Sequence, residues 1–168
     1  MIVLEKIGHI NSFEINNRDI DLFCLHWYEA RKRILRKTTQ SGKEVCIKFL
    51  NKHPGLAEGD VLSEDDNAVV VVSILPCDCI VAQPKNMFEM ASVSYEIGNK
   101  HLPLFYDLDQ LLSPFELPLY KLLLAQGYEV KKENRKLLHP LETTVSPHRE
   151  GSVDTLFTKI MKLTNSTP

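Results

Sequence analysis

The order of hydrophobic and polar residues predicts β-strands in the first half of the chain. Residues 44–49 alternate between polar and apolar side chains, the period-two pattern of a strand with one buried face. A Ser-Gly turn separates them from a partner strand over residues 33–39. The β-branched run at residues 68–75 predicts a further, buried strand. Because no helical period appears before about residue 84, we expect residues 1–75 to form a small all-β domain.

The second half of the chain predicts helices as well as strands. After a short apolar run at residues 79–82, a helix is expected over residues 84–98, because Phe88, Ala91 and Tyr95 recur at helical spacing.

Glycines and prolines indicate where the remaining elements begin and end. Gly98-Asn99 predicts the C-terminal cap of the first helix, since both residues tolerate the left-handed conformation. We expect a strand over residues 101–106, a second helix over residues 113–127, and a final strand over residues 128–138. The expected inner face of the second helix consists of Leu119, Leu122, Leu123 and Gln126.

We interpret the order as strand, helix, strand, strand, helix and strand, which is the ferredoxin-like βαββαβ arrangement, with only one of its two middle strands placed, at residues 101–106. We therefore predict an α+β fold, in which the all-β domain precedes a ferredoxin-like domain over residues 76–150. Residues 151–168 are expected to form a flexible C-terminal tail.

Charge and hydropathy narrow the functional classes. The chain carries 20 basic and 22 acidic residues, a net charge of 20 − 22 = −2, and so lacks the basic surface of a general nucleic-acid binder. An RNA-recognition module would need basic residues where Asp107 and Asp109 stand beside Phe105 and Tyr106. No run approaches the ~18 apolar residues of a membrane helix, and the N-terminus has no signal-peptide pattern. We expect a cytoplasmic protein with no nucleic-acid or membrane partner.

Catalytic motifs are missing from the sequence. It has no Walker A loop, no G-x-G-x-x-G, no G-x-S-x-G and no H-E-x-x-H, so we predict that the protein is not an enzyme. Cys77 and Cys79 would face the same side of a strand and could reach one metal ion. Two thiolates do not make a closed site, however, and no second Cys/His pair has zinc-finger spacing. Two small residues in a strand are the simpler interpretation.

Six histidines are the other candidate ligands. His9, His26 and His53 have no partner nearby in sequence, which favours structural roles. His101 stands at the entry to an expected strand. A twofold dimer would bring two copies of it together, and two imidazoles suit Ni²⁺, Cu²⁺ or Zn²⁺ rather than Mg²⁺ or Ca²⁺. A capping or packing role is the alternative for this residue.

Four segments resemble a known family. Residues 95–104 contain Gly-Asn-Lys-His ending at His101, which resembles the Gly-Asn-(Arg/Lys)-His motif of the UreE family of urease accessory proteins. Residues 27–33, followed by the Ser-Gly hairpin, and residues 58–62 are similar to the N-terminal half of that family. Leu122-Leu123 followed by a glycine fits its second helix, so the resemblance spans nearly the whole chain.

The resemblance implies a nickel metallochaperone with an N-terminal peptide-binding-type domain and a ferredoxin-like metal-binding domain. It implies a homodimer in which both copies of His101 bind one Ni²⁺, with Zn²⁺ or Cu²⁺ as alternative ions. His148 best matches the C-terminal histidine that completes the site, and His139 is a weaker candidate. The implied partners are a UreG-like GTPase and the urease maturation complex.

Two features limit or compete with this interpretation. Residues 149–168 contain no histidine, so the chain lacks the histidine-rich tail with which some relatives store nickel. A protein-interaction module, in which His101 only packs and no metal binds, is the alternative function. The sequence leaves open whether dimers pair further through metal, and which surface of the β domain meets the partner.

Overall fold

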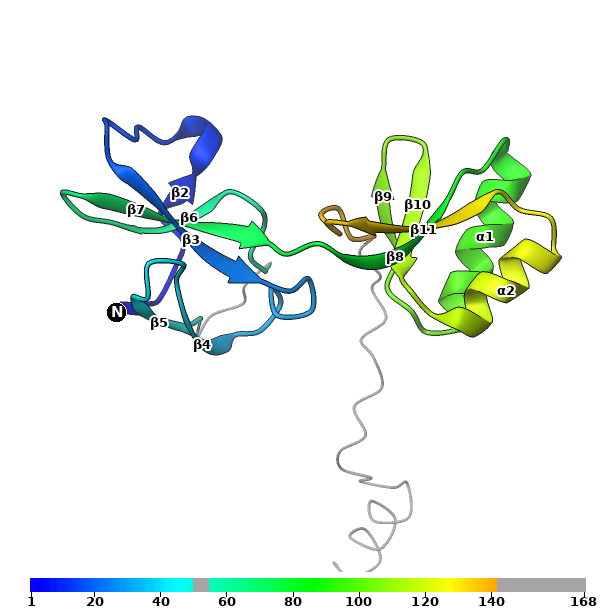
Figure 1. Ribbon diagram of the computed structural model, residues 1–168, viewed down its shortest axis with the longest axis horizontal. Coiled ribbons are helices and arrows are strands. Elements are labelled where there is room, and N and C mark those ends of the chain that lie inside the picture. Colours follow the sequence, from blue (N-terminus) through cyan, green and yellow to red (C-terminus); the bar gives the residue numbers. More distant parts are fainter. Residues whose placement is uncertain (50–54, 142–168) are drawn as a thin grey trace, which may run out of the picture.

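The computed structural model describes residues 1–49 and 55–141 (Figure 1). The fold is α+β, as predicted: a region of strands comes first, and a βαββαβ unit follows. We call residues 1–75 the N-terminal region and residues 76–141 the C-terminal region. The tail expected at residues 151–168 lies outside the described residues.

The N-terminal region contains two sheets. One has three strands in the order β1-β5-β4, and the other has four in the order β2-β6-β7-β3. The strands and one 3₁₀-helix (η1) follow one another along the chain as β1 (Ile2–Val3), β2 (Gly8–His9), η1 (Ile10–Ser12), β3 (Asp19–Leu25), β4 (Ile34–Thr38), β5 (Glu44–Lys48), β6 (Asp60–Glu64) and β7 (Ala68–Ile74). The sequence predicted β4, β5 and β7 but not the parallel pairings β1·β5 and β3·β7.

The valine run of β7 explains how this region is held together. Val70 and Val72 belong to the main core between the two sheets, together with Phe23 and Ile47. Val69 and Val71 point to the other face of the sheet, where Val61 joins them in a smaller cluster. Both faces of β7 are therefore buried, which is why its sequence is a continuous apolar run rather than an alternating one.

The C-terminal region has one antiparallel sheet with two helices on one side (Figure 1). Its elements are β8 (Cys77–Ala82), α1 (Met87–Asn99), β9 (Phe105–Asp107), β10 (Gln110–Pro114), α2 (Leu117–Ala125) and β11 (Val130–Arg135). The sheet order is β11-β8-β10-β9. Ile80 and Leu111 face the helices, while Val81 and Leu112 lie in a second cluster on the opposite face.

Both helices begin later than predicted, because capping residues set their first turns. The Asn86 side chain accepts a hydrogen bond from the Glu89 N–H (3.0 Å), so α1 begins at Met87. The Glu116 carboxylate accepts from the Leu119 N–H (3.2 Å), so α2 begins at Leu117.

The other predicted boundaries in this region also need correction. The strand expected over residues 101–106 starts only at Phe105, and β10 ends with two residues, Ser113 and Pro114, that were assigned to the second helix. Leu119 and Leu123 are buried as expected, but Gln126 is exposed. Its amide donates to the Glu96 carboxylate at 3.0 Å, which links the ends of the two helices.

The two regions contact each other through the second face of the C-terminal sheet. Trp27 packs against the cluster that contains Phe105 and Leu137, and its ring meets Phe105 edge-on with centroids 5.8 Å apart. The Lys136 ammonium lies 2.7 Å from the Glu58 carboxylate across the same boundary. Among the helices of the described part of the chain, none is long and apolar enough to cross a membrane.

Candidate functional site

His101 is the residue at which the chain leaves α1. Its backbone has a φ of 55°, in the left-handed region. The His101 N–H donates to the Gly98 carbonyl (2.9 Å) and the Leu102 N–H donates to the Ile97 carbonyl (3.3 Å). This pair of bonds is a Schellman motif, and Leu102 also packs against the apolar cluster that contains Ile97.

The predicted cap at Gly98-Asn99 is therefore wrong by two residues. Both belong to α1, and the left-handed position is taken by His101 itself. A residue with a Cβ atom is destabilised by about 1 kcal/mol in this conformation, whereas glycine is not. Strained positions of this kind concentrate at functional sites. The exposed His101 side chain fits a residue kept for its imidazole rather than for its backbone.

One exposed face of α1 is apolar. Met87, Phe88 and Tyr95 are 87%, 77% and 69% exposed, whereas Val93 and Ile97 on the opposite face are buried. The helical spacing in the sequence thus marked the exposed face rather than the buried one. We define the α1 stripe as Met87, Phe88, Ala91, Tyr95 and Gly98. A concentrated apolar surface of this kind is typical of an interaction site.

His101 lies in no complete set of metal ligands within the described part of one chain. Within the described residues, no group of three or more His, Cys, Asp or Glu side chains could hold a metal ion. His139 is exposed, and its ring lies 5.6 Å from the Tyr106 ring. His148 lies outside the described residues. A complete site at His101 would need ligands from a second copy or from the C-terminal residues.

The last described residues head toward His101. The Tyr106 N–H donates to the His139 carbonyl (2.9 Å), and the Leu141 N–H donates to the Leu104 carbonyl (2.7 Å). The two segments therefore run antiparallel, and Phe105 pairs with Pro140 between them. Each step along the chain toward Leu141 approaches residue 101.

The other histidines and cysteines of the described residues serve the fold. His9 accepts from the Asn11 N–H at Nδ1 (3.2 Å) and caps η1, and His26 stacks on Tyr28 with ring centroids 5.2 Å apart. Burial raises the pKa of the Cys77 thiol, and it raises the pKa of Cys79 to about 11. Burial thus disfavours the thiolate form in which cysteine binds metal. His53 lies outside the described residues.

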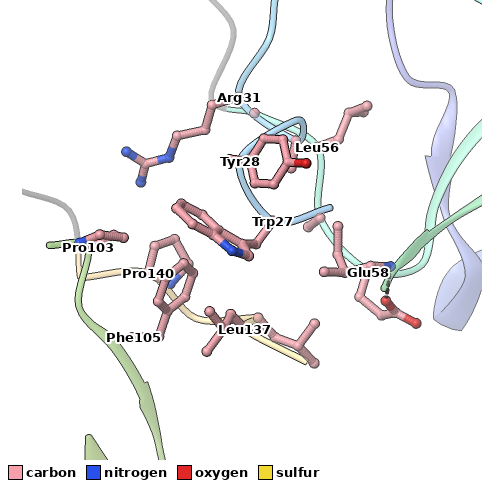
Figure 2. Close-up of a pocket in the computed structure, with 14 residues that line it drawn as sticks. Trp27, Tyr28, Arg31, Leu56, Glu58, Pro103, Phe105, Leu137 and Pro140 are labelled. Carbon is pink, nitrogen blue, oxygen red and sulfur yellow. Dashed lines mark hydrogen bonds between the residues drawn. The ribbon is translucent and has the colours of Figure 1, made fainter. Parts of the chain in front are cut away.

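A pocket of about 210 Å³ lies where the two regions meet (Figure 2). We call it the Trp27 pocket; its apolar wall is formed by Trp27, Leu56, Pro103, Phe105, Leu137 and Pro140. Tyr28 and Arg31 also line it. The sequence does not predict this pocket, because its wall comes from four segments that lie more than 25 residues apart along the chain.

Comparison with known proteins decides the family. The family model of the UreE urease accessory protein N-terminal domain matches residues 3–75. The chain is 45% identical over 163 residues to the urease accessory protein UreE of Flavobacterium johnsoniae, covering 97% of this chain and 99% of that protein. The chain belongs to the UreE family. It is also 43% identical to the UreE of Acetivibrio thermocellus, over 84% of this chain and 92% of that protein.

Membership in the UreE family confirms the resemblance on which the sequence interpretation rested. The UreE of Helicobacter hepaticus, 36% identical over 136 residues, bears the same name. UreE proteins are accessory proteins of urease, not its catalytic chain. In this UreE family member, the Gly-Asn-Lys-His motif forms the exposed C-terminal end of α1 and places its histidine beside the α1 stripe.

Proposed function

We propose that this chain is a cytoplasmic nickel metallochaperone that acts in urease maturation and is not an enzyme. Two copies hold one Ni²⁺ between them and deliver it to urease through a UreG-like GTPase. Residues 1–75 act as a peptide-binding-type domain and residues 76–150 as the metal-binding domain. The observation that carries the proposal is the exposed imidazole of His101 at the end of an exposed apolar helix face, in a member of the UreE family.

The α1 stripe supports a dimer with the metal site at its centre. A Cβ added to Gly98 would meet no atom within 4 Å in the single chain, although glycine in a helix costs about 1 kcal/mol relative to alanine. Nothing inside one chain therefore requires glycine there, whereas close approach of a second helix would. A twofold contact brings identical residues together. Packing of two stripes would set the two His101 side chains at one interface.

Two imidazoles make an open site that suits a carrier. They favour Ni²⁺, and Zn²⁺ or Cu²⁺ could occupy the same position. Positions on the metal stay free for a ligand from the C-terminal residues or from a recipient protein. His148 is our candidate for that ligand, since residues 139–141 approach residue 101 as the chain runs toward it. Imidazole binds metal only when it is neutral, so nickel binding releases protons and weakens as the pH falls.

Nickel titration calorimetry tests the proposal. We expect His101→Ala to abolish high-affinity binding and leave the dimer intact, since its backbone bonds do not depend on the ring. His148→Ala should weaken binding without abolishing it. Unchanged binding in His101→Ala would contradict the assignment. Absence of nickel binding in the unaltered protein would favour the alternative of a protein-interaction module, for which the Trp27 pocket supplies an apolar binding surface.

A further inference from the structure

We propose that residues 153–163 of the C-terminal segment dock into the Trp27 pocket of their own chain. Docking fixes the segment that carries His148 at both of its ends and so keeps this histidine near His101. The docking itself rests only on the pocket and the sequence. Its effect on metal binding rests on the proposed function.

The Trp27 pocket is large enough for an aromatic side chain. Its volume is about 210 Å³, and an apolar cavity of about 150 Å³ already holds benzene. Figure 2 shows Trp27 between the Pro103, Phe105 and Pro140 side and the Leu56 side, with open space around its ring. Apolar surface of this kind gains free energy when another apolar group covers it.

The C-terminal segment contains apolar residues that need such a cover. The tail is polar only as far as Ser152. Apolar residues then recur at the i, i+3, i+4, i+7 and i+8 positions that share one face of a helix: Val153, Leu156, Phe157, Ile160 and Met161. Thr155, Thr158, Lys159 and Lys162 fall on the opposite face, and Asp154 lies at the edge of the apolar face. This pattern predicts an amphipathic helix whose apolar face requires a partner surface.

The last described residues lie at the Trp27 pocket. Pro140 lines the wall, and Leu141 is the last described residue. The distance along the chain to Val153 is 153 − 141 = 12 residues, which can span up to roughly 40 Å when extended. A short tether of this kind makes docking intramolecular, at an effective concentration in the millimolar range. Docking on the chain's own pocket is therefore favoured over docking on a second copy.

The charges at the pocket rim complement the start of the segment. Arg31 is exposed and points over the opening beside Trp27 (Figure 2). Glu58, the acidic residue in the lining, already has the Lys136 ammonium 2.7 Å away. Asp154 comes one residue after the first apolar residue of the segment, so its carboxylate can meet the Arg31 guanidinium while Phe157 enters the pocket.

Docking would confine His148. The residues between Leu141 and Val153 would be held at one end by the pairing with Leu104 and at the other by the pocket. Pro103, two residues after His101, belongs to the same pocket wall. Both anchors thus lie close in the chain to His101, and the tethered segment carries His148 between them.

Trp27 is the single tryptophan of the chain and reports on the pocket directly. In the full-length, metal-free protein, we expect Phe157→Asp to shift Trp27 emission to the red and to raise its quenching by acrylamide. Thr158→Asp, the adjacent change on the opposite face, should leave both unchanged. Circular dichroism of both variants checks that the fold is retained. Identical emission in the unaltered protein and Phe157→Asp would overturn the docking, as would a shift that depends on protein concentration.

A charge exchange tests the rim contact. Arg31→Glu should raise Trp27 quenching, and combining it with Asp154→Lys should restore the original value. Lys48→Glu, an exposed charge reversal on β5 away from the Trp27 pocket, is the matched control. Failure of the double variant to recover would overturn the pairing of Arg31 with Asp154.

Nickel measurements separate this proposal from the proposed function. If the segment docks in the unaltered protein, Phe157→Asp should lower nickel affinity. The loss should match that of His148→Ala, and the number of ions per dimer should not change. If His101→Ala bound nickel normally while Phe157→Asp still shifted Trp27 emission, the docking would stand and the metal assignment would fail. If Phe157→Asp left nickel affinity unchanged, the positioning of His148 by docking would be wrong.

Discussion

His9 in the N-terminal region and His101 in the C-terminal region look alike in sequence, but the fold uses them differently. The His9 ring accepts from the Asn11 N–H and donates from Nε2 to the Glu58 carbonyl (3.0 Å), so both nitrogens serve local structure. His101 bonds through its backbone, and within the described residues no hydrogen bond or ring contact engages its imidazole. A free imidazole in a strained backbone position is the stronger sign of function.

The same contrast holds for apolar residues. Val69 and Val71 in β7 are covered on a second face of their sheet, whereas Phe88 and Tyr95 in α1 stay exposed. The valines of β7 are covered within one chain. The α1 stripe stays exposed and ends beside His101, and it is the surface that we propose for a second copy.

The largest effect should come from a charge in the α1 stripe. Phe88→Asp should cost about 2 kcal/mol or more of association free energy, roughly a thirtyfold rise in the dimer Kd. Analytical ultracentrifugation measures this directly. Leu108→Asp, at a residue 93% exposed in the β9–β10 turn, is the control and should leave the dimer intact. Equal association of both variants would place the interface elsewhere.

A smaller effect is expected when the structural histidine is removed. His9→Ala deletes the cap of η1 and the bond to the Glu58 carbonyl, which should lower the free energy of unfolding by about 1–2 kcal/mol. Urea denaturation gives this value, and nickel binding should not change. Loss of nickel binding in a stably folded His9→Ala protein would erase the distinction between the two histidines.

His101→Gly should stabilise the fold, whereas His9→Ala should destabilise it. Glycine relieves the left-handed strain, so the free energy of unfolding should rise by up to about 1 kcal/mol while the metal ligand is lost. Gly127→Ala is the matched control, because Gly127 has a φ of 83° with open space around its Cβ position and should be destabilised by the change. A destabilised His101→Gly protein would mean that the ring contributes to packing.

The smallest effect concerns acid stability of the N-terminal region. The Lys43 ammonium, followed by the Ala68 and Asn67 N–H groups, lowers the pKa of Asp65 from 3.8 to about 2. A lowered pKa in the folded state gives stability that is complete above pH 4 and is lost as the pH falls toward 2. Asp65→Asn should flatten this part of the pH profile in thermal unfolding. An unchanged profile would show that the carboxylate contacts add nothing.

The sequence predicted the order of elements better than their ends. Period and turn residues revealed the βαββαβ order, but side-chain caps at Asn86 and Glu116 set the helix starts. β10 was not placed, because residues 110–112 were assigned to no element and Ser113 and Pro114 were assigned to the following helix. The parallel strand β3 was missed because its partner β7 is more than forty residues away.

Some features of the candidate site could be predicted from the sequence, and others depend on the fold. His101 could be singled out from its motif, whereas its left-handed backbone results from the Schellman motif that ends α1. The α1 stripe was visible as a spacing, but its exposure depends on the opposite face packing on the sheet. The Trp27 pocket could not be foreseen, since Trp27 and Phe105 meet only when the two regions fold together.

The central claim is that two copies of His101 share one nickel ion. Native mass spectrometry of the protein titrated with Ni²⁺ tests it most directly, with the His101→Gly variant measured alongside. We predict a dimer that gains one Ni²⁺ in the unaltered protein and a dimer that gains none in the variant. One ion on each single chain, or equal nickel binding in the two proteins, would contradict the account.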